Sequence, residues 1–121
     1  MARTTFAGPI AVGKGTTPAV TQITSRSTGV TLNASSGRIT MDATSLAAAA
    51  EATFVVTNSF VTANSVPVIA LASGSTAATS VAVVSAVADG SFSITLTNLN
   101  AATADTGAGV INFIVFNGAT A

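Results

Sequence analysis

Few side chains in this sequence could carry out chemistry, and the two most versatile types are absent. The 121 residues include no His and no Cys. His is the usual acid–base catalyst near neutral pH, and His and Cys together supply most ligands of zinc, haem and iron–sulfur clusters. The sequence therefore predicts neither a cofactor nor a dedicated metal site.

Two patterns among the remaining charged residues suggest catalysis or phosphate binding. Asp42 and Glu51 flank an alanine-rich stretch and could approach each other as a glycosidase-like carboxylate pair. Residues 13–17 are similar to a phosphate-binding loop, but the first glycine of that motif is missing. Solvated turn charges explain the carboxylates more simply, and we expect a protein that is not an enzyme.

The composition favours a protein whose surface is covered by partners. Only 7% of the residues are charged, whereas a typical soluble domain has about 25%. Hydrophobic residues make up 49% of the chain, and the formal net charge is zero. A free monomer of this kind should dissolve poorly. The composition thus predicts contacts with copies of the chain or with other proteins, although Ser and Thr hydroxyls could also hydrate the surface.

The few charges are unevenly distributed along the chain. Residues 1–26 contain Arg3, Lys14 and Arg26 and no acidic residue, whereas the remainder contains one basic and four acidic residues. This asymmetry is either chance or a basic N-terminal segment that meets an acidic partner surface. Nucleic acid is not an expected partner, because the chain has no Tyr or Trp to stack on bases.

Residues 1–18 are predicted to form an extended N-terminal arm, and residues 19–121 a single domain. Prolines and glycines interrupt the arm and disfavour a packed element there. Ile10 and Val12 could insert into a neighbour as alternate side chains of an added strand, or the segment could simply be a floppy terminus. No apolar run is long enough to cross a bilayer, and the first residues lack the apolar core of a secretion signal. We therefore expect no membrane partner, and synthesis in the cytoplasm.

Alternating apolar and polar residues predict about seven to nine short strands joined by Gly, Asn and Ser turns. Residues 92–97 show the clearest alternation, after an Asp89-Gly90 pair that predicts a hairpin turn. Residues 30–33 and 39–42 are predicted to form a second hairpin around a Ser-Gly turn. The stretch Ser45–Glu51 is expected to be a loop with at most one helical turn, and its role cannot be assigned.

Two apolar runs complete the expected fold. Pro67 restricts the run at residues 66–72 to a sheet edge or a bulge. Residues 110–116 are apolar on both faces, which predicts a central strand or one covered by a partner, with Phe116 as an interface residue. The other phenylalanines considered are expected in the core, namely Phe54, Phe60, Phe92 and Phe113. These elements predict an all-β fold, a single antiparallel β-sandwich or jelly-roll-like domain.

Several stretches of the sequence resemble a group of small structural proteins of tailed bacteriophages. They are residues 20–33 (VTQITSRSTGVTLN), 36–41 (SGRITM), 54–59 (FVVTNS), 90–98 (GSFSITLTN) and 110–115 (VINFIV). The resemblance covers most of the predicted domain and contains no catalytic residue. It implies a capsid decoration, or cement, protein on the outer capsid surface of the virion. Such proteins are commonly homotrimers that bind the major capsid protein and bridge its neighbouring subunits.

Two other functions remain open from the sequence. A tail-fibre or receptor-binding domain would use the same sandwich, but it would present binding aromatics in exposed loops. A pilin-like subunit would share the Thr- and Ala-rich composition, but it should carry a secretion signal and often a disulfide. The residues predicted to contact a partner are Arg3, Ile10, Val12, Lys14, Arg26 and Phe116.

Overall fold

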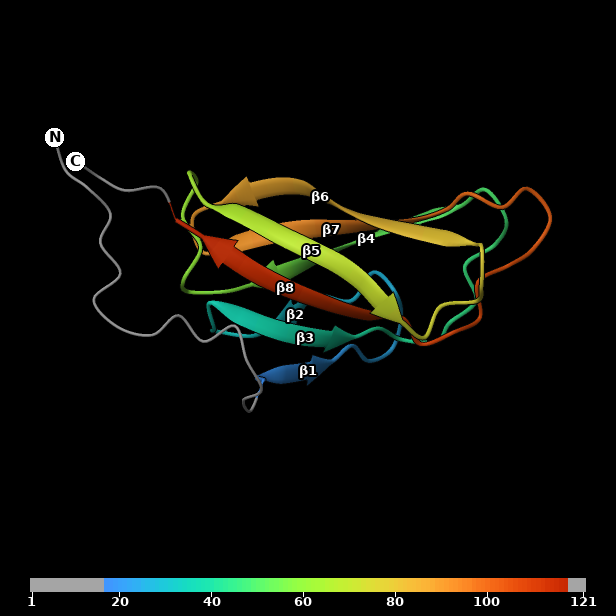
Figure 1. The fold of residues 1–121 in the computed structure, drawn as a ribbon, viewed down its shortest axis with the longest axis horizontal. Helices are drawn as coiled ribbons and strands as arrows, with labels where there is room; N and C mark the ends of the chain where they lie inside the picture. The colour runs from blue at the N-terminus through green and yellow to red at the C-terminus, as the bar shows by residue number, and fades with distance from the viewer. Residues whose placement is uncertain (1–16, 118–121) are drawn as a thin grey trace, which may run out of the picture.

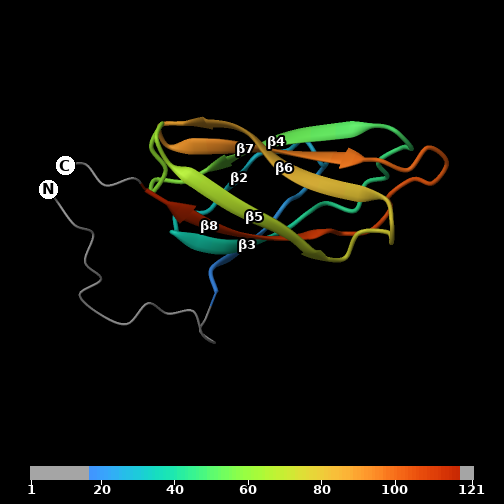
Figure 2. The same ribbon diagram turned by 45° about the horizontal axis from the view of Figure 1, so that its top comes forward.

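Two β-sheets packed face to face make up the structure, a computed structural model that describes residues 17–117 (Figure 1, Figure 2). This part of the chain contains eight strands and no helix, so it has no helix that could cross a membrane. The strands are β1 (Ala19–Thr21), β2 (Val30–Thr31), β3 (Ser36–Thr40), β4 (Glu51–Thr57), β5 (Val66–Ser73), β6 (Ser80–Ala88), β7 (Ser91–Asn98) and β8 (Val110–Phe116). The predicted all-β sandwich is confirmed.

The two sheets have four strands each and are mixed. Sheet A has the order β1-β3-β8-β5, and sheet B has the order β2-β4-β7-β6. Most neighbouring strands are antiparallel, but β1 runs parallel to β3 and β2 runs parallel to β4. The prediction of purely antiparallel sheets is therefore wrong at these two pairs. Six of the seven connections between consecutive strands cross from one sheet to the other, because only β6 and β7 share a sheet.

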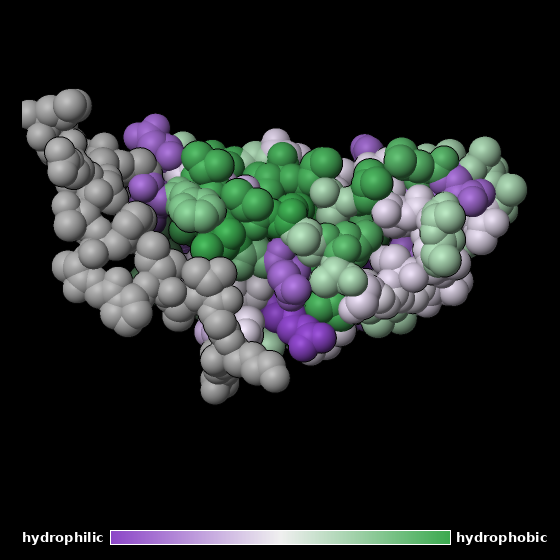
Figure 3. Space-filling model, viewed as in Figure 1, coloured by the Kyte–Doolittle hydropathy of each residue, from purple (hydrophilic) through white to green (hydrophobic). Residues whose placement is uncertain are grey.

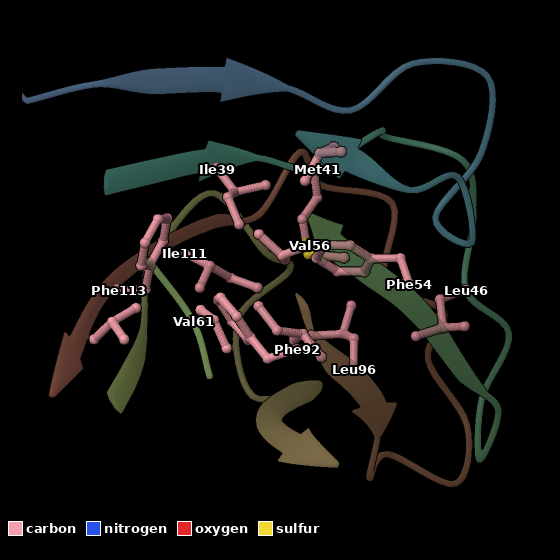
Figure 4. Close-up of a cluster of buried hydrophobic side chains, with 13 residues drawn as sticks. Ile39, Met41, Leu46, Phe54, Val56, Val61, Phe92, Leu96, Ile111 and Phe113 are labelled. Atoms are coloured by element: carbon pink, nitrogen blue, oxygen red, sulfur yellow. The ribbon is translucent and has the colours of Figure 1, made fainter. Parts of the chain in front are cut away.

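The hydrophobic core lies between the sheets, where alternate side chains of each strand meet (Figure 4). On β7 the side chains of Phe92, Ile94 and Leu96 are buried, and the residues between them are half-buried Ser and Thr. Phe92 packs edge-to-face against Phe113 of β8, with 5.6 Å between the ring centroids. Burial of each such side chain contributes about 1.5–3 kcal/mol, so this layer holds the two sheets together.

Three local predictions are confirmed. Asp89 and Gly90 form the turn of the β6–β7 hairpin, and Gly90 adopts a φ of 80°, which glycine tolerates best. Strand β8 is central in sheet A, between β3 and β5. Strand β5 is an edge strand that begins with Val66 and Pro67 and has a register shift between Leu71 and Ser73.

The predicted hairpin around residues 35–37 is wrong. Strands β2 and β3 belong to different sheets, so the chain crosses the sandwich between them. Gly37 lies within β3 and is buried, and a Cβ built there would come within 2.6 Å of Leu32 Cδ2 and 2.8 Å of Phe113 Cε1. The glycine thus makes room for two core side chains and does not form a turn.

Two further predictions concern the loops before and after β4. The prediction that Phe60 lies in the core is wrong: it is exposed in the loop between β4 and β5, where the adjacent Val61 takes the buried position. In the stretch Ser45–Glu51, residues 45–50 form a loop without a helix, as predicted, and Glu51 begins β4. Leu46 anchors this loop, because its side chain is buried and its backbone exchanges hydrogen bonds of 2.8 and 2.9 Å with Asp105.

Candidate interaction surface

The carboxylates of the described residues do not gather into a metal site. Residues 17–117 contain no group of three or more His, Cys, Asp or Glu side chains that could hold an ion. Asp42 accepts hydrogen bonds from the backbone NH of Thr44, at 2.8 Å, and from its hydroxyl, and these bonds lower the pKa of Asp42. Asp42 therefore serves to fold its own loop.

Two charged side chains are instead buried at the end of the sandwich where four loops meet. Arg26, in the loop after β1, is only 3% exposed. Its Nη2 donates hydrogen bonds to the carbonyl oxygens of Gly107, at 2.7 Å, and Asp105, at 3.2 Å, and its Nε donates to the carbonyl of Thr44. The same Nη2 lies 3.8 Å from Asp105 Oδ1. Arg26 thereby ties the β1–β2 loop to the β3–β4 and β7–β8 loops, and we name this site the Arg26–Asp105 cluster.

The carboxylate of Asp105 completes this cluster. Its Oδ1 accepts hydrogen bonds from the backbone NH groups of Thr76, at 2.9 Å, and Gly107, at 3.0 Å, and its Oδ2 accepts one from the Ser80 hydroxyl, at 2.7 Å. Burial alone would raise the pKa of Asp105, but these hydrogen bonds and the charge of Arg26 lower it to about 2. The carboxylate is thus fully ionised at neutral pH and joins the β5–β6 loop to the others.

The prediction that Arg26 contacts a partner is therefore corrected. Its guanidinium group is buried and bound to groups of its own chain, so it is not available to an acidic surface elsewhere. The sequence pattern grouped Arg26 with two cations of the N-terminal segment, although it belongs to the folded domain. Arg3, Ile10, Val12 and Lys14 lie outside the described residues.

The outer side of sheet A carries an exposed apolar surface. It consists of Val66 and Val68 on β5 and Ile114 and Phe116 on β8, and we name these four side chains the apolar face. Val66 is 59% exposed and Phe116 is 55% exposed. Figure 3 shows hydrophobic residues gathered over this part of the molecule. A shallow hollow of about 240 Å³ lies beside them and is lined mainly by apolar residues, with Asn112 as the polar member.

Strand register explains why these side chains form one surface. Val66 is paired with Phe116, and Val68 is paired with Ile114, so the four side chains lie in two adjacent rows on the same side of the sheet. The residues on either side of Ile114, Phe113 and Val115, point inward and are buried. Because β8 is apolar at nearly every position, filling the core leaves a second set of apolar side chains facing outward.

The outer side of sheet B has a different chemistry. Along β7 the outward side chains are Ser and Thr, and Thr95 at the centre forms hydrogen bonds with both neighbouring strands. The hydroxyl groups of Thr53 and Thr95 lie 2.8 Å apart, and the Thr95 hydroxyl donates to Ser85 Oγ at 2.9 Å. Exposed valines remain here at Val55 and towards the β6 edge at Val81 and Val83. The centre of the outer side of sheet B is thus lined with hydroxyl groups.

The sequence identified part of the apolar face. Phe116, which the sequence predicts as an interface residue, lies within it, and its contact with a partner stays a prediction. The sequence does not single out Val66, Val68 and Ile114, because it shows the two apolar runs only as separate strands. Once β5 and β8 are known to be neighbours in the sheet, their outward-facing side chains can be recognised as one surface.

Comparison of this chain with protein-family models, with curated proteins and with solved structures finds no match. The apolar face and the Arg26–Asp105 cluster therefore have to be interpreted from their own geometry.

Proposed function

We propose that this protein is a non-enzymatic structural component of a virion, namely a capsid decoration protein that bridges neighbouring subunits of the shell. The observation that carries the proposal is the apolar face, where four large apolar side chains are exposed together on one sheet. Contiguous exposed apolar surface on a soluble domain usually marks a site of contact with another protein. The narrower assignment to a phage capsid rests on the sequence resemblance.

The rigidity of the apolar face supports a docking role. Ile114 and Phe116 are carried by β8, which is hydrogen-bonded to β5 along this stretch, and Ile114 also pairs with Ser36 of β3. A partner would therefore meet a preformed surface and would lose little binding free energy in ordering it. Burial of each of these side chains contributes about 1.5–3 kcal/mol before the entropy of association is subtracted.

A bridging protein needs only modest affinity at each contact. When one molecule or one oligomer contacts the shell at several points, the later contacts form at high effective concentration, and the overall affinity greatly exceeds that of one contact. The uncharged character of the apolar face also predicts that binding depends little on salt. This mechanism stiffens a shell without any chemical step.

Sedimentation with capsid shells tests this proposal. Purified protein is added to shells assembled from the major capsid protein alone, and the fraction that pellets with them is measured. We expect saturable binding by the wild type and at least tenfold weaker binding by Phe116→Asp. The matched control is Val55→Asp, which places the same charge at an exposed position on the outer side of sheet B.

Two results would contradict the proposal. Wild-type protein that fails to pellet with any shell would exclude the decoration role, and binding to whole host cells instead would favour the receptor-binding alternative. Equal loss of binding in the Phe116 and Val55 variants would mean that the apolar face is not the contact surface.

A further inference from the structure

Strand β6 is a long edge strand of sheet B. It has nine residues, pairs with β7 along one side, and has no partner among residues 17–117 along the other. Its inward side chains, including Ala82, Val84 and Val87, are only half-buried, whereas Phe92 and Ile94 on the neighbouring β7 are fully buried. The open edge therefore leaves backbone hydrogen-bonding groups and part of the core uncovered.

The other edges carry features that discourage pairing with a further strand. Strand β1 has three residues and β2 has two. Strand β5 contains Pro67, which cannot donate a hydrogen bond. Strand β2 pairs only with the last two residues of β4, and the part of β4 that it leaves uncovered begins with the charged Glu51. Strand β6 has no charged residue, no Pro and no Gly, and its one irregularity lies between Val84 and Ala86. Such an edge is prone to pair with another strand.

We infer that β6 pairs antiparallel with β6 of a second copy of this chain, so that two copies of sheet B form one continuous eight-stranded sheet. When two identical strands pair antiparallel about a two-fold axis, residue i faces residue j and j faces i, and the residues near the axis face their own copies. Charged residues would repel there, and β6 has none. The net charge of zero also removes general repulsion between two copies.

Packing adds a second reason for this partner. Val81 and Val83 point outward from β6 and are exposed, and the second β6 would place β-branched side chains beside them. Cross-strand pairs of such residues stabilise antiparallel sheets. The added strand would also cover the half-buried Ala82, Val84 and Val87 at the open edge.

This inference is independent of what binds the apolar face, because that face lies on the outer side of sheet A. It also differs from what the phage resemblance implies. Self-pairing of β6 about a two-fold axis closes after two copies and gives a dimer, whereas the resemblance implies a trimer. The mass of the oligomer in solution distinguishes the dimer from the trimer.

Light scattering on the purified protein provides the test. We expect the wild type to have twice the chain mass of 11.7 kDa. Val83→Lys places a charge on the outward side of β6, where the side chain is 51% exposed, and should raise the dissociation constant at least tenfold. The matched control is Val55→Lys, at a side chain that is 45% exposed on β4 of the same sheet, and this variant should remain a dimer.

A monomeric or trimeric wild type would overturn the inference, and so would a Val83→Lys variant that remains a dimer. If that variant does not fold, the test is hydrogen exchange of the wild-type β6 amides that point away from β7. Protection of these amides that decreases on dilution supports the pairing, whereas the absence of such protection, or protection that does not depend on concentration, contradicts it.

Discussion

Charged side chains are usually exposed and large hydrophobic side chains are usually buried. The Arg26–Asp105 cluster and the apolar face are opposite exceptions to this rule. The cluster buries two charged side chains at the loop end of the sandwich, and the apolar face exposes four hydrophobic side chains on sheet A. The buried charges bind three carbonyl groups, two backbone NH groups and a hydroxyl of the same chain, and only Arg26 Nη1 lacks a hydrogen-bond partner among the charged atoms of the cluster. The exposed face has no cover within residues 17–117.

This difference separates a role in folding from a role in binding. Removal of one partner from a buried ion pair leaves an uncompensated charge, so the fold depends on the complete cluster. Removal of an exposed apolar side chain leaves the core intact, so the fold should not depend on the apolar face. Variants in the two regions should therefore change different measured quantities.

The largest expected effect is loss of stability in Asp105→Ala. Without the carboxylate, Arg26 stays buried with its charge uncompensated, and two backbone NH groups lose their acceptor. We expect the free energy of unfolding to fall by about 3–5 kcal/mol in urea titrations. Glu51→Ala, at an exposed position, is the control and should change it by no more than about 0.5 kcal/mol. Equal effects of the two variants would show that the cluster is not needed for the fold.

Acid should weaken the cluster in a defined pH range. The pKa of Asp105 is lowered to about 2 in the folded protein from 3.8, so its contribution is complete above pH 4 and is lost as the pH falls towards 2. The expected loss is about 2 kcal/mol, measured as the unfolding free energy at a series of pH values. Asp42 has a lowered pKa too and acts in the same direction. The difference between the wild type and Asp105→Asn isolates Asp105, and a difference that does not change with pH would contradict the assignment.

Replacing apolar side chains of the apolar face with hydroxyl-bearing ones, like those on the outer side of sheet B, should weaken binding but not folding. In the double variant Val68→Thr and Ile114→Thr, exposed β-branched side chains are kept but become polar. We expect the unfolding free energy to change by less than about 1 kcal/mol, because surface substitutions each have small effects. Binding to capsid shells should weaken by about tenfold, which corresponds to about 1.4 kcal/mol. A large loss of stability would mean that this face is part of the folding core.

The smallest effect is expected when a hydroxyl-bearing side chain on the outer side of sheet B is replaced by an apolar one. Thr95→Val removes hydrogen bonds with Thr53 and Ser85 and adds a half-buried methyl group at the centre of that face. Exposed hydroxyl bonds contribute little, and Val favours a strand, so the unfolding free energy should change by less than about 1 kcal/mol. Binding to shells should be unchanged. A gain in shell binding would show that any apolar patch on the sandwich is sufficient.

Much of the fold could be predicted from residue patterns within single strands. The alternation at Phe92, Ile94 and Leu96 correctly predicts β7, and Asp89-Gly90 correctly predicts the hairpin before it. These signals are local, because side-chain period and turn type depend on neighbouring residues alone. The central position of β8 also follows from its apolar residues on both faces.

The remaining features depend on contacts between residues far apart in the chain. Arg26 and Asp105 are 79 positions apart, and no local pattern shows that they meet. Gly37 resembles a turn residue in the sequence, although it is required by the close approach of Leu32 and Phe113. The apolar face requires the register of β5 against β8, which the sequence patterns of the two strands do not contain.

The order of strands in sheet A has a consequence for synthesis on the ribosome. Strand β8 is the last of the eight strands along the chain, yet it lies between β3 and β5 and pairs with both. Sheet A therefore cannot form until β8 has emerged, and folding must wait for these distant pairings. The apolar face draws half of its side chains from β8, so a nascent chain does not present it. The surface that we propose for docking is completed only after the rest of the sandwich has been made.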